Sequence, residues 1–306
     1  MAKRIAILHG GWSAERPVSL VSGAAVAEAL KERGHDAYLI DVTRDLPALI
    51  DALTPRPSIV FNALHGHGGE DGTIQGVLDM LGLPYTHSGL LPSAIAMSKP
   101  VTKRLLADHG VRSPKGVVAP RDHVATSHVM PPPYVVKPAA EGSSFGVRMV
   151  GPNDNAPPLD VKGWTFGEDV LVEEYIPGRE LTVGVIGDRA LTVTEITHQH
   201  GFFDYDAKYT AGHAVHVLPA RIPQDVFDEA MRVALLAHQA LGCAGISRSD
   251  FRYDDSRPGL EGLYFLEINT QPGFTPISLV PEQAAHVGVS FADLCEWLME
   301  NATCPA

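Results

Sequence analysis

The first part of this 306-residue chain predicts a doubly wound α/β domain. Short apolar runs at residues 4–8, 37–41 and 58–62 have the composition of buried parallel strands. Helical periodicity covers residues 18–33 and 74–81, after the first and third of these strands. Strands that alternate with helices in this order typically form a parallel sheet with helices on both faces.

Two glycine-rich loops, residues 9–15 and 63–72, directly follow the first and third predicted strands. Ligands of open α/β sheets bind at the carboxyl ends of the strands, so both loops are candidate ligand-binding segments. Neither loop has the spacing of a P-loop, and Gly10-Gly11 does not form a dinucleotide fingerprint. The sequence therefore does not indicate a P-loop NTPase or a dehydrogenase.

The remainder of the chain predicts a mixture of antiparallel strands and separate helices. Strands are expected at residues 116–118, 134–138, 169–176, 180–186, 190–195, 247–253 and 263–266, and helices at residues 100–108, 223–241 and 291–300. A turn at residues 254–259 contains Pro and Gly, so it predicts a hairpin between the last two strands.

This hairpin carries a candidate metal site. Asp250 lies on its first strand, and Glu267 and Asn269 are two apart at the end of the second, hence on one face. Pairing would bring three oxygen ligands together, a set that suits Mg²⁺. Asp250 alone, or Glu267 and Asn269 alone, would more often belong to a solvated strand face. Arg248 on the same strand and the glycine of Asn269-Thr-Gln-Pro-Gly273 favour a phosphate and oxyanion site instead.

Other segments could contact phosphate. Lys137 ends an apolar strand, where it either reaches phosphate or extends its charge to solvent. The small residues and hydroxyls of residues 140–146 suit a mobile phosphate-covering loop. The long aromatic loop 198–213 is a candidate lid. Its histidines have no cysteine support, so zinc is not favoured.

Composition limits the possible partners and compartment. The formal net charge of -12 disfavours nucleic acid and an anionic membrane as partners. The three cysteines have no metal or disulfide spacing, which indicates a reducing compartment. No signal segment and no run of 18 apolar residues is present, so we expect a cytoplasmic protein.

Taken together, these motifs resemble the D-alanine–D-alanine ligases of the ATP-grasp superfamily. The resemblance runs nearly end to end. Its motifs are Gly10-Gly-Trp-Ser-Ala-Glu-Arg16, Ala63-Leu-His-Gly-His-Gly-Gly-Glu-Asp-Gly-Thr73, Val136-Lys-Pro138, Glu141-Gly-Ser-Ser144, Tyr205-Asp-Ala-Lys-Tyr209 and Glu267-Ile-Asn-Thr-Gln-Pro-Gly273. It implies an N-terminal α/β domain (residues 1–96) followed by a two-part ATP-grasp fold (residues 97–178 and 179–306), with ATP held between the two parts.

The resemblance also implies roles for individual residues. The ATP site would comprise Lys99, Lys137, Glu173, Glu174, Ile176, Glu180 and Lys208. Asp250, Glu267 and Asn269 would hold two Mg²⁺ or Mn²⁺ ions. Glu15, Ser143 and Tyr209 would form a hydrogen-bonded set around the first D-alanine, near His65. Arg248 and Gly273 would stabilise the oxyanion, and Ser278 and Leu279 would hold the second D-alanine.

The implied reaction is ATP-dependent ligation of two D-alanines through an acyl phosphate, for peptidoglycan precursors, by a homodimer. Alternatives are a D-alanine–D-lactate ligase, another ATP-grasp amino-acid ligase, and a non-catalytic ATP-binding module. Tyr209 after Lys208 resembles the dipeptide-forming branch, and retention of Arg248 and the metal ligands disfavours the non-catalytic module. Two departures from the family pattern, Ser98 and Phe203, concern ATP and loop affinity rather than the reaction.

Overall fold

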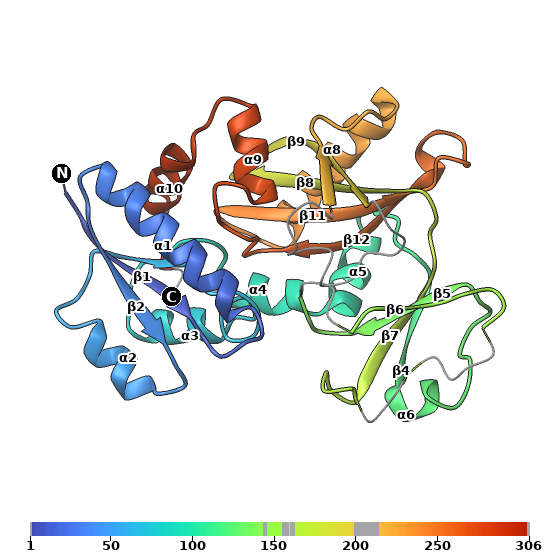
Figure 1. Cartoon of the computed structure of the whole chain (residues 1–306), viewed down its shortest axis with the longest axis horizontal. Helices are drawn as coiled ribbons and strands as arrows, with labels where there is room; N and C mark the ends of the chain where they lie inside the picture. Colours follow the sequence, from blue (N-terminus) through green and yellow to red (C-terminus); the bar gives the residue numbers. More distant parts are fainter. Residues whose placement is uncertain (1, 143–145, 155–158, 160–162, 199–213, 305–306) are drawn as a thin grey trace.

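The computed structural model describes residues 2–142, 146–154, 159, 163–198 and 214–304. Three β-sheets organise this part of the chain (Figure 1). No helix within these ranges has the length and apolar character needed to cross a membrane.

The N-terminal sheet is parallel, as the alternating pattern predicts. Its strands are β1 (Arg4–Gly10), β2 (Asp36–Val42) and β3 (Ile59–Asn62), in the order β2-β1-β3. The helices that accompany it are α1 (Arg16–Glu32), α2 (Leu46–Ala52) and α3 (Thr73–Met80). Isolated bridges join Val60 to Tyr85 and Tyr85 to Thr303, so the C-terminal end of the chain pairs beside this sheet. The short helix α2 was not predicted from periodicity.

The central sheet is antiparallel, with the order β4-β7-β5-β6. Its strands are β4 (Gly116–Pro120), β5 (Tyr134–Pro138), β6 (Arg148–Val150) and β7 (Asp169–Glu174), and α6 (Arg121–Val124) follows β4. Helices α4 (Leu90–Met97) and α5 (Lys99–Ala107) precede it. The predicted strand 169–176 was two residues too long, because the chain leaves the sheet after Glu174 and passes through Pro177-Gly178 to the next sheet.

The C-terminal sheet has five antiparallel strands in the order β10-β9-β8-β11-β12. They are β8 (Arg179–Ile186), β9 (Arg189–His198), β10 (Ala214–Val217), β11 (Ile246–Tyr253) and β12 (Leu263–Asn269). The predicted hairpin is confirmed: β11 pairs with β12, with a short 3-10 turn (Gly259–Gly262) before β12. Helix α8 (Gln224–Ala240) packs on this sheet through buried residues such as Val226 and Ala230.

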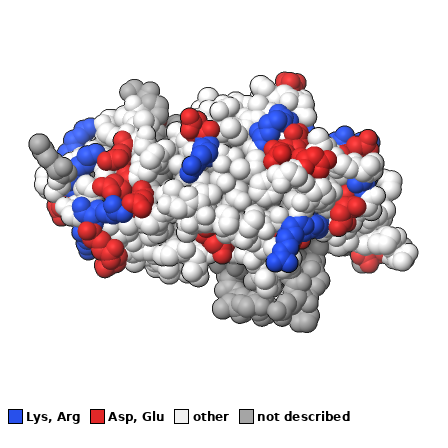
Figure 2. All heavy atoms as spheres, turned by 90° about the horizontal axis from the view of Figure 1, so that it is seen from above, with Lys and Arg blue, Asp and Glu red and all other residues white. Residues whose placement is uncertain are grey.

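The last two helices are α9 (Leu279–His286) and α10 (Phe291–Glu300). In Figure 1, α10 lies beside α1 although the two helices are far apart in sequence. Leu294 and Leu298 of α10 share one hydrophobic core with Val26 and Leu30 of α1. At the surface, Arg33 bonds to Asp293 and Glu296. The face drawn in Figure 2 has acidic and basic side chains interspersed, without one large area of either sign.

Candidate active site

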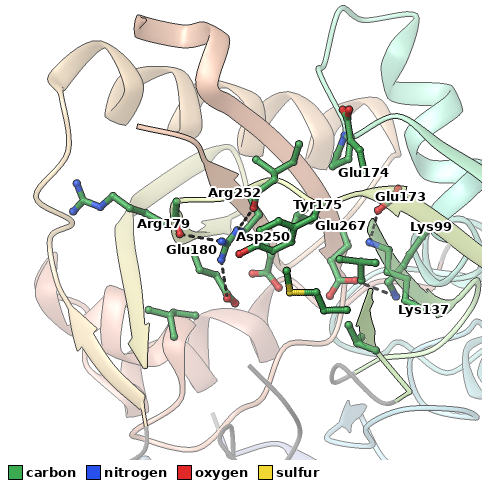
Figure 3. A pocket seen from close by; sticks show the side chains of 18 of the residues that line it. Lys99, Lys137, Glu173, Glu174, Tyr175, Arg179, Glu180, Asp250, Arg252 and Glu267 are labelled. Carbon is green, nitrogen blue, oxygen red and sulfur yellow. Dashed lines mark hydrogen bonds and ion pairs between the residues drawn. The ribbon is translucent and has the colours of Figure 1, made fainter. Parts of the chain in front are cut away.

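A cavity of about 610 Å³ lies between the central sheet and the C-terminal sheet (Figure 3). The central sheet contributes one wall, which carries Lys137 and Glu173, with Lys99 of α5 beside them. The C-terminal sheet contributes the other wall, with Glu180, Asp250 and Arg252. The segment that connects the two sheets, residues 175–178, lies along one end of the cavity.

On the central wall, one buried carboxylate is paired with two lysines. Glu173 is 3% exposed; its Oε2 lies 2.6 Å from Nζ of Lys137, and Nζ of Lys103 bonds to its Oε1. Burial opposes ionisation of Glu173, but the two lysines hold its pKa below the usual range. Burial and the charge of Lys137 lower the pKa of Lys103 to about 7. This cluster therefore sets two basic side chains against one carboxylate.

On the C-terminal wall, the hairpin register places Asp250 directly opposite Glu267 and Arg248 directly opposite Asn269. The guanidinium of Arg248 donates to both carboxylate oxygens of Asp250, at 2.9 and 2.8 Å, and the Thr182 hydroxyl donates to the same carboxylate at 2.7 Å. Oε2 of Glu267 lies 3.0 Å from Nζ of Lys99. The hairpin thus brings together the carboxylates and the amide that the sequence predicts.

The donor set of this hairpin fits a hard divalent cation. Two carboxylates and an amide lie on one face of β11 and β12, and Mg²⁺ prefers such oxygen ligands. Oδ1 of Asn269 accepts a 2.7 Å hydrogen bond from the backbone N–H of Gln271, which fixes the orientation of the amide. Among the residues that the structure describes, no cluster of three or more His, Cys, Asp or Glu side chains could hold a metal. A cation here would depend on ligands from its substrate or from water.

At the far end of the cavity, arginines and carboxylates from adjacent strands are paired (Figure 3). Arg252 donates from Nε to the carbonyl of Ile176 at 3.1 Å, and its Nη1 lies 3.9 Å from Oε2 of Glu180. Arg179 forms a close ion pair with Glu195. Glu174 accepts a 3.0 Å hydrogen bond from the backbone N–H of Lys115. The connecting segment that carries Ile176 is therefore fixed to β11.

The two loops of the N-terminal domain converge around Glu15, the residue before α1, which is 6% exposed. The hydroxyl of Ser13 donates to the carbonyl of His65 at 2.6 Å, which joins the first loop to the second. A methyl group added at Gly66 or at Gly142 would lie 3.2 Å from Oε1 of Glu15. Glu15 is thus enclosed by both glycines, and neither position has room for a larger residue without displacing its neighbours.

His65 lies at the base of this region and is 2% exposed. Its Nε2 lies 3.0 Å from the hydroxyl of Ser22, and its Nδ1 lies 3.4 Å from Oε1 of Glu70. Burial alone would lower the pKa of His65, but the hydrogen bond to Glu70 and the charges of Glu70 and Glu15 raise it. The charged imidazole is therefore favoured beside these two carboxylates.

The loop after β12 joins the hairpin to the N-terminal domain. Nδ2 of Asn62, at the end of β3, donates to Oε1 of Gln271 at 3.3 Å, and Nε2 of Gln271 donates back to the carbonyl of Asn62. Further along the loop, Oγ of Ser278 accepts a 3.0 Å hydrogen bond from the N–H of Thr275. Gly273 and Ser278 face each other at the start of α9, whose first residue is Leu279.

The structure thus brings together most of the side chains that sequence reasoning selected. Ser143, Lys208 and Tyr209 lie outside the described residues, as do residues 199–213 of the predicted lid. Sequence reasoning missed Lys103, Thr182 and Glu70, all of which contact the selected residues. Glu70 stands in the selected 63–72 loop, whereas Lys103 resembles an ordinary surface lysine of an amphipathic helix.

Two antiparallel sheets that enclose a cavity lined by lysines and carboxylates define the ATP-grasp class of fold. The family models described as "D-ala D-ala ligase C-terminus" and "D-ala D-ala ligase N-terminus" match residues 119–300 and 47–88. The chain belongs to the D-alanine–D-alanine ligase family.

Relatives and solved structures agree over the full length. The D-alanine–D-alanine ligase of Rhodospirillum rubrum is 54% identical, with all of both chains covered. That of a Caulobacter species is 56% identical over 97% of this chain and 93% of its own. A crystal structure of the Bacillus anthracis D-alanine–D-alanine ligase complexed with ATP has a TM-score of 0.81 and 29% identity, and covers 98% of this chain and 97% of its own.

Proposed function

We propose that this protein joins two D-alanine molecules into D-alanyl-D-alanine at the expense of ATP, as a step of peptidoglycan precursor synthesis. The observation that carries this proposal is the position of Lys99. Its ammonium group contacts Glu267 on the hairpin at 3.0 Å and also bonds to the carbonyl of Glu141, next to Gly142. Gly142 in turn lies against Glu15 of the N-terminal domain. One cation therefore links the nucleotide cavity to the pocket around Glu15.

The cavity walls suit the phosphates and the base of ATP. Lys99 and Lys137 offer positive charge to phosphate oxygens. Glu174 at the end of β7 and Ile176 of the connecting segment offer backbone groups to adenine. Glu180 would bind the ribose. Glu173 fits the adenine site less directly, because its carboxylate already bonds to two lysines. We therefore propose that Glu173 orients Lys137 and that neighbouring groups contact the adenine.

Asp250, Glu267 and Asn269 would hold the two Mg²⁺ or Mn²⁺ ions. When bound, such ions neutralise the charge that develops on the transferring phosphate. The chain itself contributes the orientation of these ligands: Arg248 and Thr182 fix Asp250, and the N–H of Gln271 fixes Asn269.

The first D-alanine would bind with its ammonium against Glu15, near His65. Its carboxylate oxygen attacks the γ-phosphorus of ATP, which releases ADP and forms an acyl phosphate. The amine of the second D-alanine then attacks the acyl carbon, phosphate leaves, and the nitrogen loses a proton. The carboxylate of this second substrate would be held by Ser278 and Leu279 at the first turn of α9, where the positive end of the helix dipole favours an anion.

The tetrahedral intermediate carries an oxyanion that needs donors fixed in advance. Arg248 is 7% exposed and held by Asp250, so its orientation is set before substrate binds. The backbone N–H of Gly273 is the second proposed donor. Ser143, Lys208 and Tyr209 complete the proposal from sequence resemblance alone, with Lys208 contacting the γ-phosphate and Tyr209 joining Ser143 and Glu15.

A paired assay tests this function. Phosphate release and product formation should be measured with ATP, Mg²⁺ and, in turn, D-alanine, L-alanine, and D-alanine with D-lactate. We expect release with D-alanine, one phosphate for each dipeptide. A depsipeptide as the main product would favour the D-lactate alternative, and release without any joined product would reject the ligase.

Cytoplasmic location, homodimeric assembly and the domain boundaries at residues 96 and 178 belong to the same proposal. Light scattering on the purified protein distinguishes a dimer from a monomer. Limited proteolysis reports the boundaries, since cleavage concentrates in exposed segments between domains.

A further inference from the structure

His67 stands two residues after His65 on the same loop, and its side chain is far more exposed than that of His65. Its ring lies between two carboxylates: Nδ1 is 3.2 Å from Oδ2 of Asp71, and Nε2 is 2.8 Å from Oε1 of Glu141. Asp71 belongs to the same loop, whereas Glu141 belongs to the segment after β5. The ring therefore connects the N-terminal domain to the central part of the chain.

Asp71 is a fixed support for this ring. Its Oδ2 accepts a 2.9 Å hydrogen bond from the N–H of Gly68, and its Oδ1 accepts a 3.0 Å bond from the N–H of Thr73 at the start of α3. A carboxylate held by two backbone groups cannot turn freely. The orientation of the imidazole is consequently set by the N-terminal domain, and Glu141 is the group that responds to it.

Glu141 and Gly142 lie where the substrate pocket and the nucleotide cavity meet. Both residues line the cavity, and the carbonyl of Glu141 accepts a hydrogen bond from Lys99. Gly142 lies against Oε1 of Glu15 and near Oε2 of Glu70. A shift of this peptide would therefore change the distance between the group proposed to hold the first substrate and the lysine proposed to contact phosphate.

The chemistry of the contact requires a doubly protonated ring. Both partners are carboxylates, so each ring nitrogen must donate a proton. The hydrogen bonds to Asp71 and Glu141 raise the pKa of His67 to about 10, against the opposing effect of burial. The side chain is 45% exposed, and an ordinary surface ion pair of that exposure would contribute little.

We infer that His67 is a positioning residue, which holds Glu141 and thereby sets the Glu141–Gly142 peptide between Glu15 and Lys99 for phosphoryl transfer to the first substrate. The inference rests on the proposed function and adds a residue to it. His67 touches neither substrate; it acts through Glu141.

The test compares His67→Gln, Glu141→Gln, the double variant and His67→Arg with the wild-type enzyme. His67→Gln should lower kcat about tenfold, as expected when one charge-assisted hydrogen bond is lost, with KM for ATP within about twofold. Glu141→Gln should have a similar effect, and the double variant should be no worse than either single variant.

His67→Arg keeps a cation that can bond to two carboxylates, so it should restore kcat to within about threefold. His109→Gln, an exposed histidine after α5, is the matched control and should behave as wild type.

A second measurement does not require turnover. Amide hydrogen exchange at Lys99, whose N–H donates to the carbonyl of Ala139 at 3.0 Å just before this peptide, should become about tenfold faster in His67→Gln and return toward the wild-type rate in His67→Arg. Any one of four results would overturn the inference. They are wild-type kcat in His67→Gln, multiplied losses in the double variant, an arginine variant as slow as the glutamine variant, and unchanged exchange at Lys99. A wild-type enzyme that releases no phosphate with D-alanine would reject the proposed function instead, and the exchange measurement would still decide whether His67 holds this peptide.

Discussion

The two walls of the cavity use the same kinds of side chain in opposite proportions. On the central sheet, one carboxylate, Glu173, is shared by two lysines and is almost fully buried. On the C-terminal sheet, the carboxylates of Asp250 and Glu267 lie opposite each other and are only partly covered by Arg248 and Lys99. We call the first the cationic wall, after the two lysines around one carboxylate, and the second the anionic wall, after its two facing carboxylates.

This difference indicates a division of tasks. A buried carboxylate whose charge is fully compensated contributes to structure, because removing it leaves buried lysines without a partner. A partly exposed pair of carboxylates can exchange its protein partners for a cation. Phosphate suits the first wall and a divalent metal ion suits the second, and a nucleotide phosphate with its metal requires both.

The largest effect is expected on the anionic wall. Asp250→Asn and Glu267→Gln should each lower kcat about 1000-fold, because loss of one anionic ligand weakens metal binding and charge neutralisation at the transferring phosphate. Turnover measured across a Mg²⁺ titration checks this, with Asp188→Asn in the exposed β8–β9 turn as the control. Rates like those of the wild type at ordinary Mg²⁺ would remove both residues from the metal site.

The cationic wall should respond in stability. Glu173→Gln leaves Lys103 and Lys137 buried side by side without a carboxylate, so the free energy of unfolding should fall by about 3 kcal/mol. Glu267→Gln, by contrast, should change it by less than about 1 kcal/mol. Urea unfolding of both variants measures the difference. Adding Lys103→Met to Glu173→Gln should recover part of the loss, and equal stability of all three variants would refute the division of tasks.

His87 is a buried group outside both walls, and its protonation shows how the core responds to a charge without a partner. His87 is 4% exposed, packs against Phe61 and Phe274, and has no hydrogen-bond partner for either ring nitrogen within the described part of the chain. Burial and the nearby His65 lower the pKa of His87 to about 3.

The sign of the resulting pH dependence follows from linkage. Between pH 6.5 and about pH 3 the unfolded chain binds a proton at His87 that the folded protein does not, so stability falls as the pH falls. At pH 5.0 this group should cost about 2 kcal/mol relative to pH 7.5. His87→Asn suits the positive φ of 71° at this position and cannot titrate there, so its unfolding free energy should fall less over the same interval. Parallel pH profiles for both proteins would place the proton elsewhere.

The smallest effect is expected for an ion pair remote from the cavity. Arg232 and Glu229 form a bidentate pair on the exposed side of α8, at 2.7 Å. Arg232→Gln should change the free energy of unfolding by less than about 0.5 kcal/mol and leave turnover unchanged, since exposed pairs contribute little. A larger loss of stability would mean that a bidentate ion pair stabilises this protein even when it is exposed. Burial would then not be needed to explain part of the stability that we expect from the ion pairs of Glu173.

The hairpin of the anionic wall could be predicted from sequence, and the pairs of the cationic wall could not. A turn between two strand-like runs fixes which residues face each other, so the juxtaposition of Asp250 and Glu267 follows from local pattern. Lys103 and Glu173 are 70 residues apart on a helix and a strand, and their contact depends on how α5 packs against the central sheet. Periodicity reports which face of an element is buried, but it does not report which polar groups meet there.

Sequence pattern also failed to predict several short elements. Helices α2 and α4 and strand β6 are only three to eight residues long, too short to show a clear period. The roles assigned to the individual site residues, Ser143, Lys208 and Tyr209 among them, remain predictions, as do the domain boundaries and the homodimer.

The position of α10 against α1 has a consequence for biosynthesis. Leu294 and Leu298 complete the core that Val26 and Leu30 begin, and Thr303 pairs with Tyr85. On the ribosome, the N-terminal sheet is made first but lacks this cover until nearly the whole chain has emerged. Contacts of such long sequence separation form slowly, and the apolar side of α1 stays open to chaperones and to aggregation in the meantime. Premature termination before α10 would therefore leave the core around α1 incomplete.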